Sequence, residues 1–385
     1  MNKKLFPLLI GVALVIKLLL FLYAESFAPE AKFMLDTQWY LQSAESFAHH
    51  GVFARSVSQD GLIYHETFRT PGYPLFLSVF HYQCHIPFSG IIVIQIILSI
   101  ITAGIVFKTV QLFCEKAAAL SAFIILFDPS TTIHSMFLLT DTLFVFLLTI
   151  FLYFFVKFIK FKSLRCLVLS ALILALASYV RPVSYFLGLG MSLFMVVFMA
   201  RHFGFKIIGY SLIFLTIIYG LIGVWHYRNY IHTKSFVFSN ISQAAVKGEG
   251  VFSNTERIRK DGKSDHLSSY RYYLNIIPRS YWELFTRPAT LKNFGNENLK
   301  LVGKIFAYPF ILFWMVGMVR GAWRMRTNIY GQICLVVILY FATVTVCAIL
   351  LNVGSRFRLP MMPCIAMLAA IGFSKNFTSK SQTTN

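Results

Sequence analysis

Long apolar runs alternate with short basic connections along the whole chain. A helix needs about 20 apolar residues to cross the roughly 30 Å hydrocarbon core of a membrane. Runs of this kind recur through the 385 residues and predict about ten transmembrane helices, at residues 5–23, 88–112, 117–133, 136–156, 166–180, 183–200, 207–226, 302–319, 329–351 and 359–373. We therefore expect an all-α, multi-pass membrane protein in which residues 1–374 form one unit and residues 375–385 form a short tail.

The charges of the connections predict an orientation. Short basic loops face the cytoplasm by the positive-inside rule, and here they lie at residues 3–4, 157–165, 201–206 and 320–326. Both termini are then cytoplasmic, in the cell membrane. The two long connections, residues 24–87 and 227–301, face the other side. The first apolar run is interrupted by Lys17 and is not followed by a small-residue cleavage site, which predicts a retained anchor.

The first long connection contains its own predicted helix. From Asp36 to His50, apolar residues recur at helical spacing, which is typical of an amphipathic helix lying at the membrane interface. Asp36 stands at the N-cap position and Gly51 at the C-terminal end. Residues 69–74, with two prolines and a glycine, then predict a turn that leads back into apolar sequence.

Composition excludes several classes of protein. Hydrophobic residues make up 57% of the chain and charged residues only 13%, against about 25% charged residues in ordinary soluble domains. This excludes a soluble domain and a disordered chain. The net charge of +20 indicates topology signals and contacts with anionic lipids rather than nucleic acid. The six cysteines are scattered and predict neither a disulfide framework nor a zinc site.

Three carboxylates are candidates for chemistry, because ionisable residues at membrane depth are rare and usually functional. Asp36 follows the first span and would either take a proton from a hydroxyl group or only cap its helix. Glu66 lies close before Arg69 and would either form a local ion pair or contribute to a site. Asp141 begins an apolar run and is either a second site carboxylate or an acid favoured by the helix dipole.

Arginines are concentrated on the same predicted side of the membrane as Asp36. A planar guanidinium binds a phosphate with two parallel hydrogen bonds, so these arginines either hold a lipid phosphate or anchor the protein to lipid headgroups. The candidates for phosphate binding are Arg69, Arg181, Arg228, Arg356 and Arg358. The sequence implies no nucleotide or redox cofactor, and it leaves a divalent metal open, for which it shows no obvious ligand cluster.

The order of these short motifs resembles one family of membrane enzymes. The segments concerned are DTQWY (36–40), FRTPGYPLF (68–76), TDTLF (140–144), YVRP (179–182), WHYRNY (225–230) and RFRLP (356–360). Together they resemble the C-type glycosyltransferase superfamily, in particular the branch of the protein O-mannosyltransferases and the lipid A aminoarabinose transferases. The resemblance implies transfer of a sugar from a polyprenyl-phosphate donor to an acceptor outside the cytoplasm, with inversion.

The resemblance also implies roles for individual residues. The carboxylate of the first outer loop acts as general base or orients the acceptor, and this role falls on Asp36. Many relatives have an Asp-Glu pair there, whereas Thr37 follows Asp36 here, so Glu66 is the alternative base. Asp141 stands where many relatives have Glu. Tyr40, Tyr73 and His65 are expected to contact the acceptor or the sugar. Residues 227–301 are too few for the β-trefoil domain of eukaryotic protein mannosyltransferases.

Two other functions compete with this interpretation. A lipid or small-molecule transporter would need acids within the spans and broken helices in paired halves, whereas here the charges gather on one side and no internal repeat is visible. A surface-polysaccharide ligase or polymerase would use a lipid-diphosphate donor instead. The sequence identifies neither the sugar nor the acceptor, which is a glycan, a lipid or a protein.

Overall fold

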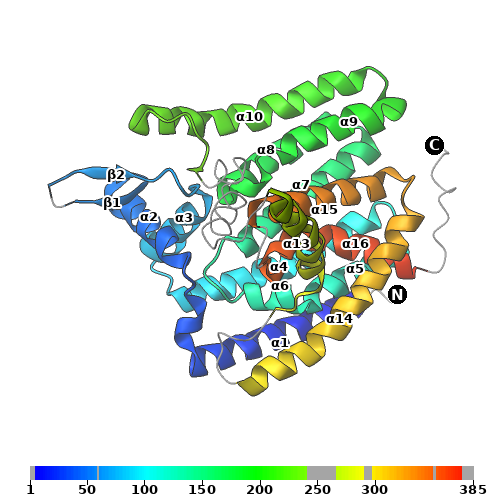
Figure 1. Ribbon diagram of the computed structural model, residues 1–385, viewed down its shortest axis with the longest axis horizontal. Helices are drawn as coiled ribbons and strands as arrows, with labels where there is room; N and C mark the ends of the chain where they lie inside the picture. Colours follow the sequence, from blue (N-terminus) through cyan, green and yellow to red (C-terminus); the bar gives the residue numbers. More distant parts are fainter. Residues whose placement is uncertain (1–4, 59, 241–265, 290–296, 350–352, 375–385) are drawn as a thin grey trace.

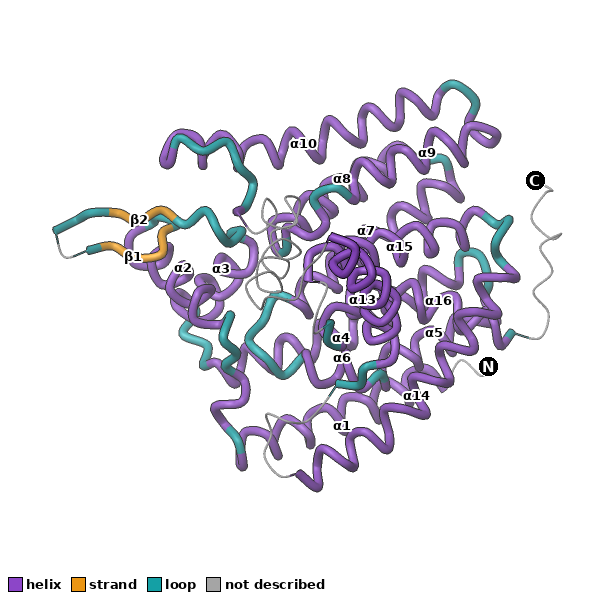
Figure 2. Tube along the Cα trace, viewed as in Figure 1, coloured by secondary structure: helices purple, strands orange, loops and turns teal. Residues whose placement is uncertain are grey.

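The computed structural model of the protein describes residues 5–58, 60–240, 266–289, 297–349 and 353–374. Apart from one two-stranded hairpin, the regular elements of this part are helices (Figures 1 and 2). The expected all-α fold is therefore confirmed. In the view of Figure 1, α8, α9 and α10 lie along one side and α1 and α14 along the other, with α4, α5, α7, α15 and α16 between them.

The elements follow one another in this order. They are α1 (Leu5–Phe27), η1 (Pro29–Lys32), α2 (Thr37–His50), β1 (Ala54–Val57), β2 (Ile63–His65), α3 (Gly72–Leu77), the π-helical η2 (Ser78–Gln83), α4 (Phe88–Gln111), α5 (Glu115–Phe127), α6 (Pro129–His134), α7 (Asp141–Phe161), α8 (Leu164–Val180), η3 (Pro182–Ser184), α9 (Leu187–Phe203), α10 (Lys206–Thr233), α13 (His266–Thr286), α14 (Glu297–Arg324), α15 (Ile329–Ile349), η5 (Ser355–Met361) and α16 (Met362–Phe373).

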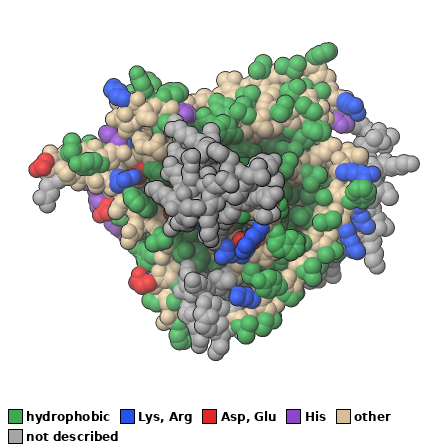
Figure 3. Space-filling model, in the orientation of Figure 1, with side chains coloured by type: hydrophobic (Ala, Val, Ile, Leu, Met, Phe, Trp, Pro, Cys, Tyr) green, Lys and Arg blue, Asp and Glu red, His purple; other side chains and the backbone are tan. Residues whose placement is uncertain are grey.

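Eight helical segments of the described part are long and apolar enough to cross a membrane, so the predicted count of about ten is not confirmed. The predicted span at 166–180 is a helix of only 17 residues, α8. The predicted span at 117–133 is interrupted, because α5 ends before Asp128 and α6 starts at Pro129. Asp128 accepts a hydrogen bond from Thr131 N at 2.7 Å and thereby caps α6. Many large apolar side chains on the helices are exposed, as lipid-facing positions should be (Figure 3).

Close contacts between backbones hold the last helices together. Gly317 and Gly321 of α14 are four residues apart and face α16, which is buried along almost its whole length. A Cβ atom at Gly321 would lie 1.9 Å from the carbonyl oxygen of Leu368. Small residues at this spacing let membrane helices approach closely, which replaces the hydrophobic driving force that is absent in lipid. Substitution of Gly321 would therefore separate α14 from α16.

The first outer loop gathers at one end of the bundle, away from the end where α1 begins and α16 ends (Figure 1). α2 starts at Thr37 and ends at His50, and Gly51 follows it as the sequence predicted, with a left-handed φ of +66°. The antiparallel hairpin β1–β2 follows, with Val57 opposite Ile63. The sequence analysis did not predict it. The strands are short and their side chains largely exposed, so no apolar alternation marks them.

Part of the second outer loop lies outside the described residues. α10 continues to Thr233, and the amphipathic α13 and the residues up to Ala289 pack against α15 and η5. The expected outward-facing basic residues Lys247, Arg257, Arg259, Lys260 and Lys263, together with Lys3, Lys4 and the tail 375–385, lie outside the described residues.

Candidate active site

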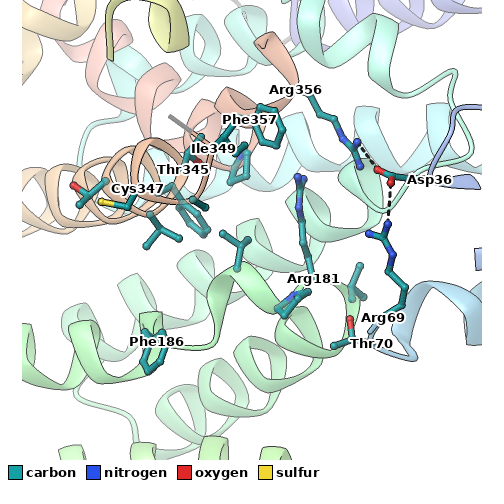
Figure 4. A pocket seen from close by; sticks show the side chains of 18 of the residues that line it. Asp36, Arg69, Thr70, Arg181, Phe186, Thr345, Cys347, Ile349, Arg356 and Phe357 are labelled. Carbon is teal, nitrogen blue, oxygen red and sulfur yellow. Dashed lines mark hydrogen bonds and ion pairs between the residues drawn. The ribbon is translucent and has the colours of Figure 1, made fainter. Parts of the chain in front are cut away.

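Asp36 lies between two arginine side chains that come from distant parts of the chain (Figure 4). Arg69 donates from Nη2 to Asp36 Oδ1 at 2.9 Å, and Arg356 donates from Nη1 to Asp36 Oδ2 at 2.9 Å. The side chain of Asp36 is still 32% exposed. The carboxylate therefore has a fixed orientation and an accessible face.

A second carboxylate extends this arrangement inward. Asp141 is completely buried and accepts a hydrogen bond from Arg356 Nε at 2.7 Å on Oδ2, while Arg181 binds its Oδ1. Arg181, Asp141, Arg356, Asp36 and Arg69 thus form one continuous row of alternating charge, which we call the charge row. Three guanidinium groups face two carboxylates, so the charge row carries one net positive charge.

Local structure aims the arginines of the charge row. Arg181 follows the last residue of α8, and Pro182 prevents the helix from continuing because it has no backbone N–H. Gly72 lets the segment that carries Arg69 approach this helix end, since a Cβ atom there would lie 2.7 Å from Tyr179 O. Arg356 stands in the 3-10 segment η5, which begins at Ser355. The end of α8, the segment before α3 and the segment η5 therefore bring their arginines to the same place.

The turn between Glu66 and Arg69 sets the direction of the Arg69 side chain. Glu66 Oε1 accepts hydrogen bonds from the backbone N–H groups of Phe68 and Arg69. The guanidinium of Arg69 also lies 5.2 Å from the ring centre of Tyr40 and donates to its hydroxyl at 3.4 Å. Its Nε atom is buried and has no hydrogen-bond partner among the described residues. Arg69 is thus held in place with one donor unused.

The charge row forms part of the wall of a cavity of about 610 Å³. Asp36, Arg69, Arg181 and Arg356 line it, and most of the remaining wall is apolar (Figure 4). The lining residues also include Tyr40, Phe68, Thr70, Val180, Pro182, Val183, Phe186, Phe341, Thr343, Val344, Thr345, Cys347, Ala348, Ile349, Phe357 and Pro360. Such a cavity suits a ligand with a long apolar part and one anionic group.

Asp36 stays ionised at neutral pH. Its partial burial raises the pKa. The hydrogen bond and charge of Arg356, followed by those of Arg69, lower the pKa by more than burial raises it, so the net pKa lies below its ordinary value. The carboxylate does not cap α2, contrary to our expectation, because its side chain makes no hydrogen bond to the helix N-terminus. The hydroxyl of Thr37 accepts from Met34 N at 2.9 Å, an N–H group that lies before the helix.

Two arginines of the predicted phosphate-binding set do not line the cavity. Arg228 donates to the carbonyl oxygens of Glu66, at 2.9 Å, and Phe53, and so ties the first outer loop to α10. Arg358 is completely buried and donates to the carbonyls of Leu284, Phe285 and Arg287 at 2.8–3.2 Å, beside the C-terminus of α13. Both guanidinium groups are occupied by backbone oxygens that only the tertiary fold brings to them.

Four other predicted site residues lie behind the cavity wall or away from it. Asp141 and Glu66 are buried and act on the arginines rather than on the cavity. Tyr73 is also buried and donates from its hydroxyl to Gln95 Oε1 at 2.9 Å. His65 stacks on His232 at 4.2 Å between ring centres. Burial and the neighbouring charges of His232 and Arg228 lower the pKa of His65.

The sequence analysis missed most of the apolar lining. Phe186, Thr345, Ile349 and Phe357 lie within or beside spans, where an apolar or small polar side chain is unremarkable. The only sequence signal for such lining residues was their position next to predicted site arginines. Phe357 stands between Arg356 and Arg358, and Pro182 follows Arg181.

Comparison with known proteins gives both a family match and structural neighbours. The model of the dolichyl-phosphate-mannose-protein mannosyltransferase family matches residues 69–225. No curated protein sequence is significantly similar to the chain. Among solved structures, ArnT from Cupriavidus metallidurans bound to undecaprenyl phosphate superposes with a TM-score of 0.57 at 14% identity, covering 97% of this chain and 60% of that one.

Archaeal oligosaccharyltransferases give similar values. AglB from Archaeoglobus fulgidus, in complex with an inhibitory peptide and a dolichol-phosphate, superposes with a TM-score of 0.55 at 14% identity, covering 94% of this chain and 50% of that one. The apo form of the Archaeoglobus fulgidus oligosaccharyltransferase superposes with a TM-score of 0.59 at 14% identity, covering 96% of this chain and 50% of that one. The chain has the fold of the C-type glycosyltransferases.

This fold confirms the resemblance drawn from the sequence and makes the chain a multi-pass membrane protein. The chain spans about 50–60% of the length of these C-type structures.

Proposed function

We propose that this protein is a membrane glycosyltransferase that transfers a sugar from a polyprenyl-phosphate donor to an acceptor outside the cytoplasm. The observation that carries the proposal is the charge row in the wall of an apolar cavity of about 610 Å³. The family match and the fold support it.

The donor phosphate would bind to the three arginines that line the cavity. Arg69, Arg181 and Arg356 offer planar donor groups in an environment of low dielectric, where their hydrogen bonds to an anion are strong. The polyprenyl chain would lie along the apolar lining, for example against Phe186 and Ile349.

Charge balance favours a monophosphate donor. A sugar joined to a polyprenyl phosphate is a phosphodiester with one negative charge, which matches the one net positive charge of the charge row. In the transfer, the acceptor oxygen attacks the anomeric carbon, the bond from that carbon to the phosphate oxygen breaks, and Asp36 receives the acceptor proton. The charge row then carries two positive charges and the departing phosphate about two negative ones. The site is balanced before and after the reaction.

Asp36 would act as the general base. It is the carboxylate of the charge row that lines the cavity, and it is ionised before the acceptor arrives. Two arginines bound to it make it a weak base in the empty site. A donor phosphate that takes hydrogen bonds from Arg69 and Arg356 would weaken those contacts and raise the basicity of Asp36. Donor binding would therefore prepare the base for the acceptor.

Three further residues would serve the site in other ways. Asp141 would be a positioning residue that holds Arg181 and Arg356 side by side from behind the cavity wall. Glu66 would position Arg69 by accepting a hydrogen bond from its backbone N–H in the turn between them. Because Glu66 would have this role, Asp36 would be the base. Tyr40 lines the cavity beside Arg69 and would contact the sugar or the acceptor.

The purified full chain, offered a set of polyprenyl monophosphate and diphosphate sugars, tests the proposal. We expect sugar release from a monophosphate donor, with inversion at the anomeric carbon. The test variant is Asp36→Asn in the cavity, which should lose activity. Its matched control is Asp60→Asn on the exposed hairpin turn, which should keep activity. Release from diphosphate donors alone would make the protein a ligase or polymerase, and lipid movement without sugar release would make it a transporter.

A further inference from the structure

A second groove lies at the end of the bundle opposite to the charge row. It has a volume of about 820 Å³ and runs between the C-terminal half of α14 and the first turns of α15. Its lining is mostly apolar and includes Met318, Val319, Ala322, Leu335 and Ile338. Thr345 and Ile349, at the other end of the same helix α15, line the cavity of the charge row. The two hollows are therefore separate.

The rim of this groove is strongly basic. Arg320, Arg324 and Arg326 line it, all three are exposed, and no lining residue is acidic. Residues 298–385 contain neither Asp nor Glu, so α14 beyond its first residue, Glu297, and the whole of α15 and α16 supply no carboxylate that could neutralise them. Basic side chains gather at this end of the molecule in Figure 3, near the ends of α14 and α16 in Figure 1.

The three arginines are not equivalent. Arg324 donates to the carbonyl oxygens of Ile371, at 3.3 Å, and Ser374, at 2.7 Å, and so completes the C-terminus of α16. The guanidinium of Arg326 lies 3.9 Å from the ring centre of Trp323, which is 69% exposed. Stacking of this kind holds a guanidinium in one orientation while its N–H groups stay free for an anion. Arg320 and Arg326 are therefore the two cations that a ligand would meet.

The position of the groove decides which ligand fits. Both helices are long and apolar enough to cross a membrane, so the apolar floor is covered by acyl chains rather than by water. Trp323 marks the level of the headgroups, where tryptophan is enriched. A zwitterionic headgroup brings its own cation beside the phosphate, whereas an anionic headgroup leaves its negative charge to the arginines. Basic pockets between membrane helices suit anionic headgroups for this reason.

We propose that the groove between α14 and α15 binds one anionic phospholipid, with an acyl chain on the apolar floor and its phosphate at Arg320 and Arg326. The bound lipid covers the exposed face of α14 next to its tight contact with α16. This site is separate from the charge row, so it neither requires nor supports the proposed glycosyl transfer.

Native mass spectrometry of the full chain in detergent tests this directly. The protein is mixed with phosphatidylglycerol or phosphatidylcholine of identical acyl chains, and the bound lipid is counted as the collision energy rises. A basic side chain near an anionic membrane surface is worth about 1 kcal/mol, which is about fivefold in binding. We therefore expect phosphatidylglycerol to bind at least about tenfold more tightly than phosphatidylcholine. The double variant Arg320→Gln/Arg326→Gln should lose this preference.

Two further variants separate the groove from general surface charge. Arg201→Gln/Lys206→Gln removes the same charge from the end of α9 and the start of α10, and the preference should persist. Leu335→Trp fills the floor of the groove and keeps every arginine, and it should weaken phosphatidylglycerol binding. Equal binding of the two lipids by the wild-type chain would overturn the proposal. An unchanged preference in the Arg320→Gln/Arg326→Gln variant, or unchanged phosphatidylglycerol binding by Leu335→Trp, would overturn it as well.

Discussion

Arg356 joins Asp36 across 320 residues of sequence, with 2.9 Å between Nη1 and Oδ2. The same guanidinium also donates from Nε to Asp141 at 2.7 Å. One side chain near the end of the chain therefore connects an accessible carboxylate of the first outer loop with a buried carboxylate at the start of α7. This contact explains why the charge row forms only when the first and last parts of the bundle pack together.

Replacement of the buried carboxylate should cost both stability and activity. Asp141→Asn leaves Arg181 and Arg356 without their shared countercharge, and removal of one partner from a buried ion pair costs about 3–5 kcal/mol. We expect a clearly lower thermal unfolding midpoint in detergent and weaker donor binding. Asp60→Asn on the exposed hairpin turn is the control and should change neither. Wild-type stability and donor affinity in Asp141→Asn would show that Asp141 does not hold the arginines.

The predicted arginines should divide into two groups. Arg69→Gln, Arg181→Gln and Arg356→Gln remove charge-assisted hydrogen bonds worth about 1.5–3 kcal/mol each. The KM for the donor should therefore rise at least about tenfold, and Lys at these positions should restore little.

Arg228→Gln and Arg358→Gln form the comparison group, because their guanidinium groups bind carbonyl oxygens instead. They should lower the unfolding midpoint, since buried carbonyls lose partners worth about 1–3 kcal/mol. The KM of the folded fraction should change less than about twofold. A rise in KM for all five variants alike would remove the distinction between cavity and structural arginines.

The lowered pKa of Asp36 predicts a specific dependence of stability on pH. A carboxyl group with a depressed pKa in the folded state stabilises the fold above its unfolded pKa of about 3.9 and stops doing so as the pH falls through the folded value. The difference in unfolding midpoint between wild type and Asp36→Asn should therefore be constant from pH 8 to about pH 5. It should shrink only below about pH 4. A difference that disappears between pH 7 and 6 would mean that the pKa is raised.

Cysteine labelling tests the predicted orientation of the protein in the membrane. The orientation predicted from basic loops puts the hairpin outside and the connection between α7 and α8 inside. In a cysteine-free background, an impermeant thiol reagent added to intact cells should label Asp60→Cys and not Ser163→Cys. The reverse pattern would invert the topology and move the charge row to the cytoplasmic side.

The sequence predicted the parts of this site that depend on rare residues in an apolar background. Asp36, Arg69, Arg181 and Arg356 are conspicuous because charged residues are scarce in so apolar a chain, and the structure brings all four to one cavity. Their order along the chain was enough to indicate the fold.

What the sequence could not predict depends on tertiary partners. Arg228 and Arg358 resemble the cavity arginines in sequence, but folded backbone carbonyls occupy their guanidinium groups. The residues next to Asp36 in the sequence are compatible with both of its possible roles, as a helix cap and as a partner of arginines. The break at Asp128 was foreseeable, because an aspartate before a proline is typical of a helix start.

The most direct test measures a single turnover of Asp36→Asn with the donor prebound. General-base assistance is worth about 10²–10⁴ in rate, or roughly 3–5 kcal/mol of barrier. We predict at least a hundredfold slower sugar transfer. Donor affinity should be equal or tighter, because Arg69 and Arg356 lose a competing carboxylate. Glu66→Gln is the comparison and should affect transfer only through Arg69. Transfer at the wild-type rate by Asp36→Asn, with the donor bound, would contradict the assignment of Asp36 as the base.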